Sequence, residues 1–417
     1  MTPSDAPVTV NCMTSACEPR PYRWVVLAAF MFVNLTIQML WISYAPVTGL
    51  AAAFYGVTDL KIGLLAMAFM IAFIPFSVPA SWAIDTLGVR KSVGFGVIVM
   101  GVFGVVRGLA GDRYPLVLAS TFCIAAIQPL LLNSWTTVPA KWFPSDQRAT
   151  AVGLVTLANL VGTAVGMVVP PVLLEAGMGI DRMQFLFGSV AAASAVVFLL
   201  LIREKPKVPP SEDAVLERAL MLDGLKNAFT SKAFLFTLAV AFVGLGIFNG
   251  VSTWVEGIIR PRGFGPSAAG TMGAVMIAGG LVGAVIIPAL SDRSGRRQRF
   301  LYISLSGAVP GLVGIAFAAN LPLLLASAAV MGFFLVSALP VAIQYAAEVT
   351  RPTPEGTSNG LIQLFGQGAV VFVYVMEAMK AEDGSFTPSL LLAAGMLALA
   401  LFFVSRMKDV VEFGEAE

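Results

Sequence analysis

Twelve long apolar runs restrict what this chain can fold into. Each is about 20 residues long, which is the length of a helix that crosses a bilayer. Hydrophobic residues make up 58% of the 417-residue chain and charged residues only 12%, whereas a soluble domain carries about 25% charged residues. So much apolar surface cannot be buried in one soluble core. We therefore predict an all-α membrane protein that is embedded in the lipid bilayer.

The runs form two sets of six, separated by a polar linker. They cover approximately residues 24–54, 61–83, 92–111, 114–139, 148–174 and 183–202, then 232–258, 267–290, 299–319, 321–347, 355–379 and 386–406. The predicted organisation is an N-terminal tail (1–22), a six-helix bundle (23–202), a linker (203–231), a second bundle (232–406) and a C-terminal tail (407–417). Apolar and charged residues alternate in the linker with the spacing of an interfacial helix, although a flexible tether is the alternative.

A short charged island recurs at a fixed distance along the chain. Asp85, Gly88 and Arg90 in the first copy correspond to Asp292, Gly295 and Arg297 in the second, and 207 positions separate each residue from its counterpart. A second motif repeats the offset, since Arg148 and Gly153 correspond to Glu355 and Gly360. Two unrelated motifs with one offset predict that the two bundles are pseudo-symmetric copies of one unit.

The basic residues predict the orientation in the membrane. With both termini inside, 19 of the 26 Lys and Arg residues lie on inner loops and tails, as the positive-inside rule requires. One of them, Arg107, lies within a span and is expected to extend outward to the interface. The outer loops carry only Lys61, Arg113, Arg182, Arg260, Arg262 and Lys380. We expect cytoplasmic termini and a plasma (inner) membrane location.

The islands resemble the loop motif of the major facilitator superfamily. Longer runs resemble the feline leukaemia virus subgroup C receptor-related transporters: Trp41-Ile-Ser-Tyr44, Leu160-Val-Gly-Thr-Ala-Val-Gly166 and Glu355-Gly-Thr-Ser358. That family is associated with transport of choline and ethanolamine, historically with haem export, and in one relative with pyridoxine. The resemblance implies a major facilitator fold and a small amine or cationic solute, held by an aromatic cage between the halves.

The resemblance also implies the candidate substrate site. The cage tryptophan of the family falls on Trp41, and its two glutamines fall on Gln128 and Gln367. The second cage aromatic, a tyrosine, falls on Asn249, and this departure removes one wall of the cage. Gln363 lies one helical turn before Gln367 and shares its face.

Several of these residues have a structural alternative. Tyr44 completes the candidate site because it lies in the same run as Trp41, although that tryptophan could equally be a packing residue. Amides at membrane depth either line a cavity or join helices. Glu256 is the candidate for proton or cation coupling, with a plain ion pair to Arg260 as the alternative.

A cytoplasmic gate follows from the repeat. We expect Asp85 near the start of the eleventh span and Asp292 near the start of the fifth span and Arg148, so that these pairs close the inner mouth. Charges that are merely solvated on loops are the alternative. The predicted gate comprises Asp85, Arg90, Arg148, Asp292, Arg297, Glu348 and Glu355.

The function predicted from these observations is secondary transport by alternating access, with a choline-like amine or quaternary ammonium as the solute. The alternatives are a pyridoxine-like amine, a drug-like amphiphile or an organic anion, with proton coupling in some cases, and a membrane receptor that does not translocate. An enzyme is not expected, because the chain has no histidine and shows no metal or Ser-His motif. No cofactor and no nucleic-acid partner are expected, and we predict a monomer.

Overall fold

The computed structural model describes residues 21–204, 229–350 and 355–407. These residues form helices and connecting turns without any strand. Twelve helical segments among them are long and apolar enough to cross a membrane, which confirms the predicted fold class. The predicted interfacial helix of the linker and most of both predicted tails lie outside the described residues.

The N-terminal half contains the first six spans. Their helices are α1 (Tyr22–Ile42) with η1 (Ala45–Val47) and α2 (Thr48–Tyr55), α3 (Asp59–Leu87), α4 (Val89–Leu109), α5 (Tyr114–Leu132), α7 (Ser145–Glu175) and α8 (Ile180–Leu201). The fourth span is shorter than the predicted 114–139, because α5 ends at Leu132 and the following residues form turns and the short helix α6 (Thr137–Trp142).

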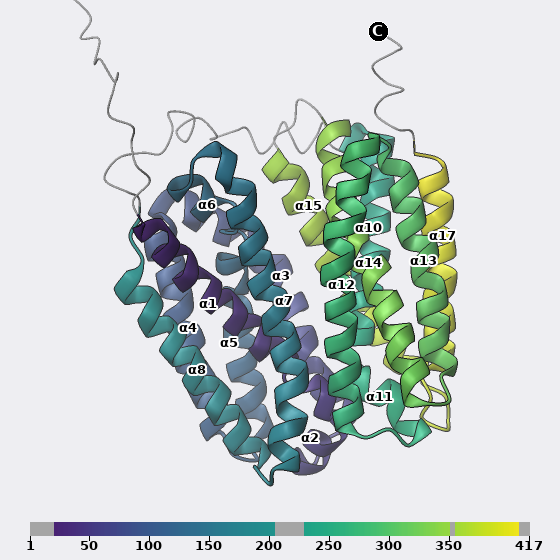
Figure 1. Ribbon diagram of the computed structural model, residues 1–417. Coiled ribbons are helices and arrows are strands. Elements are labelled where there is room, and N and C mark those ends of the chain that lie inside the picture. Colours follow the sequence, from purple (N-terminus) through teal and green to yellow (C-terminus); the bar gives the residue numbers. More distant parts are fainter. Residues whose placement is uncertain (1–20, 205–228, 351–354, 408–417) are drawn as a thin grey trace, which may run out of the picture.

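The C-terminal half contains the other six spans. Its helices are α10 (Lys232–Thr253), α11 (Val255–Ile259), η3 (Arg260–Arg262), α12 (Pro266–Ser294), α13 (Arg297–Phe317), α14 (Leu321–Val349), α15 (Glu355–Gly368), α16 (Val370–Ala378) and α17 (Thr387–Ser405). The two halves lie side by side (Figure 1), with α2 and α11 at one end and α6 and the start of α15 at the other. We call these the α11 end and the α6 end.

The backbone repeats with the offset that the charged islands predicted. Among the described residues, six of the seven glycines with positive φ form pairs that are 207 positions apart, namely Gly56 with Gly263, Gly88 with Gly295 and Gly177 with Gly384. Each ends a helix or forms a turn where a side chain would strain the backbone. Helices α3 and α12 also begin and end at positions related by this offset. The two halves are therefore structural copies.

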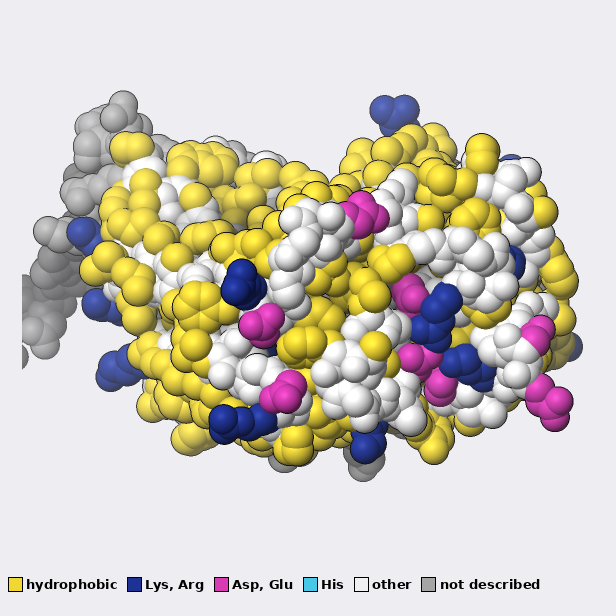
Figure 2. Space-filling view, turned by 90° about the horizontal axis from the view of Figure 1, so that it is seen from below, with side chains coloured by type: hydrophobic (Ala, Val, Ile, Leu, Met, Phe, Trp, Pro, Cys, Tyr) yellow, Lys and Arg dark blue, Asp and Glu magenta, His cyan; other side chains and the backbone are white. Residues whose placement is uncertain are grey.

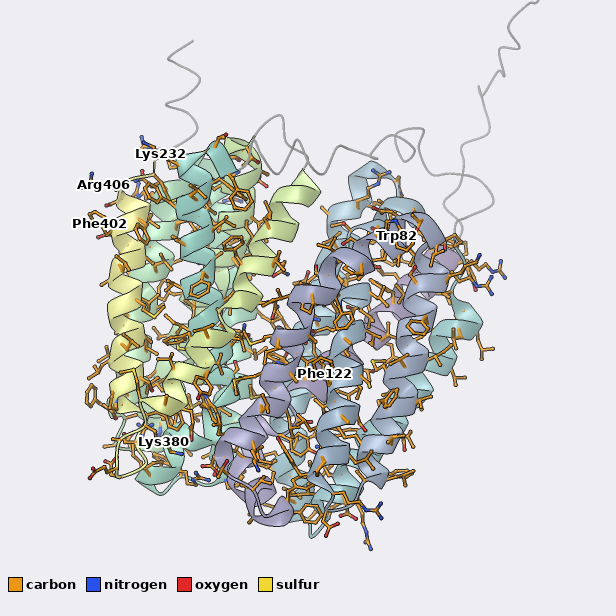
Figure 3. The ribbon with its side chains drawn as sticks, turned by 180° about the vertical axis from the view of Figure 1, so that it is seen from behind. Trp82, Phe122, Lys232, Lys380, Phe402 and Arg406 are labelled. Carbon is orange, nitrogen blue, oxygen red and sulfur yellow. The ribbon has the colours of Figure 1, made fainter. Side chains whose placement is uncertain are left out.

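Small residues let the helices within each half approach closely. Gly104 on α4 faces Gly188 on α8, and Gly332 on α14 faces the backbone of Met276 on α12. Such contacts replace hydrophobic burial as the attractive force inside a bilayer. Large apolar side chains remain on the outer surface, among them Trp82, Phe122 and Phe402 (Figure 3), where they suit contact with lipid.

Three spans are interrupted rather than continuous. The first breaks between Ile42 and Thr48, the seventh at Trp254, and the eleventh at Ala369. The first two breaks are equivalent in the repeat, because Val47 and Trp254 are 207 positions apart and each precedes a short helix. Breaks inside a membrane free backbone polar groups for other partners and are common at transporter sites.

Candidate functional site

Trp41 lies in the last turn of α1, directly before the break in the first span. Its side chain is buried, and its indole Nε1 donates a hydrogen bond of 3.2 Å to the carbonyl oxygen of Ala66 on α3. An indole has only this one donor. The bond therefore satisfies the polar group of the ring and fixes the direction in which the ring points.

The four candidate amides come from both halves. Gln128 on α5 and Asn249 on α10 are buried, whereas Gln363 and Gln367 on α15 are partly exposed. The carbonyl oxygen Oε1 of Gln128 is buried and has no hydrogen-bond partner among the described residues. No hydrogen bond in the described part of the chain joins any of these amides to another or to Trp41. The described residues therefore show no hydrogen-bonded network among these amides, and their joint role in one site stays a prediction.

The side chain of Tyr44 contacts other residues of the N-terminal half. Its hydroxyl shares a hydrogen bond of 2.9 Å with the hydroxyl of Tyr55, and the guanidinium carbon of Arg107 lies 5.3 Å from the centre of its ring. The side chain is only 2% exposed. The hydroxyl and the ring of Tyr44 thus have partners within the N-terminal half, and its role in binding the solute stays a prediction.

The outward extension expected for Arg107 is wrong. The side chain is 1% exposed and donates to Leu40, Ser43 and Gln184 inside the N-terminal half. Because α1 ends beside it, polar acceptors are available at membrane depth and the arginine does not need to reach the interface.

A further polar pair lies near Trp41 and was missed from the sequence. Gln38 on α1 donates a hydrogen bond of 2.6 Å to Asn159 on α7, while Gln38 Oε1 and Asn159 Nδ2 have no other partner among the described residues. Gln38 precedes Trp41 by three positions, so the two share one face of the helix. An amide at membrane depth on the same face as Trp41 was the available signal.

Charged side chains join the two halves at the α11 end. Asp59 of the N-terminal half accepts hydrogen bonds from both Arg260 and Lys380 of the C-terminal half. Glu377 pairs with Lys380 at 3.3 Å. Lys380 is labelled at this end in Figure 3, and Figure 2 shows acidic and basic groups close to one another on the face at this end. Asp59 therefore bridges the halves.

Glu256 also contributes to the contact between halves. One carboxylate oxygen accepts a 3.2 Å hydrogen bond from the backbone N–H of Gly49 and lies 3.5 Å from the Arg260 guanidinium. Gly49 and Glu256 are equivalent positions of the two copies, 207 residues apart. Burial raises the pKa of the Glu256 carboxyl, although Arg260 and the Gly49 N–H act in the opposite direction. Glu256 thus forms the ion pair with Arg260 that was considered as its alternative role.

Tight packing accompanies these polar contacts. Gly63 on α3 lies against the buried indole ring of Trp254, and a Cβ added there would overlap that ring. Its equivalent in the repeat, Gly270 on α12, would place a Cβ 2.6 Å from the carbonyl oxygen of Met167 on α7. Each half therefore contributes a glycine that allows the other half to approach.

At the α6 end, the ion pairs among described residues stay within one half. Arg297 pairs with Asp292 and, at 3.1 Å, with Glu348, all three in the C-terminal half. In the N-terminal half Glu204 pairs with Lys141 at 2.6 Å. Asp292 is thus bonded to Arg297 of its own half, and its contact with the start of the fifth span stays a prediction.

The remaining residues of the predicted gate lie at the α6 end in different surroundings. Asp85 and Arg90 are exposed on the turn between α3 and α4, and Arg148 donates to the Phe143 carbonyl oxygen at 3.2 Å. The side chain of Glu355 lies outside the described residues. The cross-half role of Asp85 and Arg148 stays a prediction.

Glu204 joins several elements at the α6 end, and the sequence did not indicate this role. Its carboxylate accepts hydrogen bonds of 3.1 and 2.7 Å from the backbone N–H groups of Val89 and Arg90, at the start of α4. An acid suits that position because a helix N-terminus is positively polarised. Burial alone would raise the pKa of Glu204, but Lys141 and these N–H groups together lower it.

Comparison with known proteins identifies the superfamily. The family model of the Major Facilitator Superfamily matches residues 26–279 and 255–414. The choline/ethanolamine transporter FLVCR2 of Homo sapiens is 27% identical over 93% of this chain and 77% of its own length. Solute carrier family 49 member A3 of Xenopus tropicalis is 28% identical over 89% of this chain and 81% of its own.

Solved structures agree on the fold. A bacterial homologue of the human lysosomal transporter Spinster, in an inward-facing and unoccupied conformation, superposes with a TM-score of 0.68 at 17% identity, covering 92% of this chain and 96% of that one. A mutant of the nucleoside transporter NupG gives 0.70 at 15% identity, covering 92% and 100%. With twelve spans, a doubled six-helix unit and a family model that matches nearly the whole chain, this protein belongs to the Major Facilitator Superfamily.

Proposed function

We propose that this protein transports a small organic amine across the membrane by alternating access. The observation that carries the proposal is the one-sided contact between the halves. The polar contacts between the halves that the described residues show lie at the α11 end and join Gly49 to Glu256, and Asp59 to Arg260 and Lys380. A carrier that rocks around a central site needs such a contact, which forms in one state and separates in the other.

The candidate site lies between this contact and the α6 end. Trp41 precedes Gly49 along the first span, Asn249 precedes Trp254 along the seventh, and Gln367 precedes the break of the eleventh. A solute held by these residues would be covered on the α11 side and approached from the α6 side. The basic loops favour the cytoplasm for the α6 end, and with it an inner-membrane or plasma-membrane location with cytoplasmic termini.

The substrate class is supported by chemistry and by the relatives. A cation over a tryptophan face gains about 0.5–2 kcal/mol, and the unpartnered Oε1 of Gln128 can accept a hydrogen bond from the ammonium N–H of ethanolamine or from the hydroxyl of choline. Relatives that match this chain over most of its length are named choline/ethanolamine transporters. We therefore propose choline or ethanolamine, or an amine of similar size.

A second solute class is favoured by two residues. Asn249 stands where the resemblance places the second cage aromatic, and Arg107 is a buried cation without a carboxylate partner among the described residues. A fixed positive charge at membrane depth disfavours another cation nearby. An organic anion or a neutral polar solute is therefore the alternative, and the uptake experiment decides between them.

The test is uptake into proteoliposomes that contain the purified protein. Radiolabelled choline and ethanolamine should accumulate, unlabelled amine inside the vesicles should accelerate their entry by counterflow, and Trp41→Ala should reduce uptake at least about tenfold. Trp82→Ala is the matched control, because Trp82 is 63% exposed on the outer surface, and it should transport normally. Uptake that survives in Trp41→Ala would refute the site, and saturable binding without counterflow would indicate a receptor.

A further inference from the structure

Arg107 is the most deeply buried charge in the described part of the N-terminal half, with 1% exposure. Its Nη1 donates to the carbonyl oxygen of Leu40 at 3.2 Å, and its Nη2 donates to Ser43 Oγ at 3.1 Å and Gln184 Oε1 at 2.5 Å. Every partner is neutral, and the ring of Tyr44 lies beneath the guanidinium. A buried arginine is costly in a membrane, so these particular acceptors need an explanation.

The acceptors surround the place where α1 stops. The helix ends at Ile42, Ser43 follows as its C-terminal cap, and the next turn is a 3₁₀ helix that contains Pro46. Proline has no N–H to offer to the preceding carbonyl groups. The carboxyl end of a helix also carries partial negative charge, which a cation stabilises. Arg107 thus adds a second donor to the Leu40 carbonyl oxygen, which also accepts from Ser43 Oγ, and it supplies the positive charge that the end of α1 lacks.

Trp41 lies in this same turn, between the two positions that Arg107 contacts. Its indole is bonded on another side to the Ala66 carbonyl oxygen on α3. The turn is therefore anchored through Arg107 on α4 and through Ala66 on α3. If Arg107 were removed, the indole bond and a long 3.4 Å hydrogen bond from Gln184 Nε2 to Ser43 Oγ would remain to hold the side chains of this turn to other helices.

We propose that Arg107, supported by Gln184, is a positioning residue for transport. It holds the broken form of the first span and thereby orients Trp41 toward the solute. The link to transport rests on the proposed function, whereas the holding of the α1 end does not. The residue does not touch the solute, and its effect on transport passes through Trp41.

The experiment compares Arg107→Lys, Arg107→Met and Gln184→Met with a matched control, Arg262→Met. Arg262 also donates to carbonyl oxygens at a helix end, those of Ile315 at 2.7 Å and Ala318 at 3.1 Å, but it lies in the other half, away from Trp41. Two readouts are needed. Hydrogen exchange of peptides covering residues 36–47 reports the α1 end directly, and uptake kinetics separate KM from the maximal rate.

Arg107→Met should lose protection in the 36–47 peptides and raise KM for the amine by about tenfold. Gln184→Met should give a smaller rise, because two acceptors of Arg107 remain, and Arg107→Lys should recover part of the loss. Arg262→Met should lower thermal stability without changing KM or the exchange of these peptides. If Arg107→Met fails to fold, Gln184→Met carries the comparison.

Unchanged exchange and KM in Gln184→Met and Arg107→Lys, with a loss of thermal stability like that of Arg262→Met, would overturn the proposal. A wild-type protein that transports no amine would instead overturn the proposed function and the link to transport. In that case, loss of protection at residues 36–47 in Arg107→Met would still support the holding of α1, and unchanged protection would refute it.

Discussion

The two ends of the molecule use their charges in different ways. At the α11 end, Asp59 of one half binds Arg260 and Lys380 of the other, and the Gly49 N–H binds Glu256 across the same boundary. At the α6 end, the described ion pairs connect helices of a single half, as Arg297 does with Glu348. The first arrangement holds the halves together, and the second makes each half rigid.

The proposed alternating access requires that the two halves rock against each other, and this difference between the ends is what such a movement needs. Contacts within a half persist through any movement, whereas contacts between halves must be lost on one side as they form on the other. The charged islands, which repeat in the sequence, belong to the persistent kind in this structure. The contacts that change involve single residues without a repeated motif, except that Gly49 and Glu256 are equivalent positions.

Substituting Gly63 should disturb the α11 end most. Gly63→Leu would overlap the buried Trp254 ring, and overpacking costs about 1–3 kcal/mol. The closed α11 end should therefore become a minor form and uptake should fall. Spin labels on exposed Thr58 and Ser267, in a background without the native cysteines, should report a longer distance.

Gly153→Leu is the control for this effect, because Gly153 lies on α7 with open space around its Cβ position. It should leave the distance between the labels unchanged. A short distance that persists in Gly63→Leu would show that the halves do not need this glycine to close.

Neutralising Asp59 should have the next largest effect. Asp59→Asn removes both ion pairs that join the halves, whereas Asp292→Asn removes one pair within the C-terminal half. Because Arg260 is partly exposed, we expect only about 1 kcal/mol, or roughly a fivefold shift away from the closed α11 end. The same label pair should respond to Asp59→Asn and not to Asp292→Asn, and equal responses would contradict the contrast between the ends.

Acidification should produce a smaller change through Glu256. Burial at the closed α11 end raises the pKa of this carboxyl, near Gly49, Arg260, Asp59 and Lys380, and opening would return it toward its ordinary value. Glu256 therefore binds its proton more tightly when the α11 end is closed. Lowering the pH from the pKa of Glu256 in the closed form to its ordinary pKa in the open form should favour closure. The label distance should shorten over that window, and Glu256→Gln should abolish this dependence. A dependence that survives in Glu256→Gln would assign it to another group.

The smallest effect is expected at the α6 end. Glu204→Gln weakens the bond to Lys141 and the cap of α4, and the carboxylate is 38% exposed, so the loss of stability should stay below about 1 kcal/mol. Folding lowers the pKa of Glu204, so its carboxylate stabilises the folded protein at pH values above the pKa of the unfolded chain. This stabilisation is lost as the pH falls through the folded pKa, and the difference between Glu204→Gln and wild type should then vanish. Thermal unfolding in detergent against pH measures this. A changed distance at the α11 end would contradict a role within one half.

The sequence could predict the spans and the repeat because both depend on patterns within short stretches of the chain. Twelve spans and the repeat come from hydropathy and from islands such as Asp85 and Asp292, because both signals are contiguous in the chain. The bridge at Asp59 could not be predicted, since its partners lie 201 and 321 residues away and depend on the conformational state. The surroundings of Arg107 were hidden for a related reason, because one of its acceptors is a backbone carbonyl oxygen at a helix break.

The most direct test of alternating access follows two distances in the same protein. One label pair is placed on Thr58 and Ser267 at the α11 end, and the other on the exposed, equivalent positions Thr86 and Arg293 at the α6 end. Choline or ethanolamine at a saturating concentration should shift both distance distributions, with one pair moving apart as the other draws together. Distances that do not change, or that both lengthen or both shorten, would contradict rocking of the halves around a shared site.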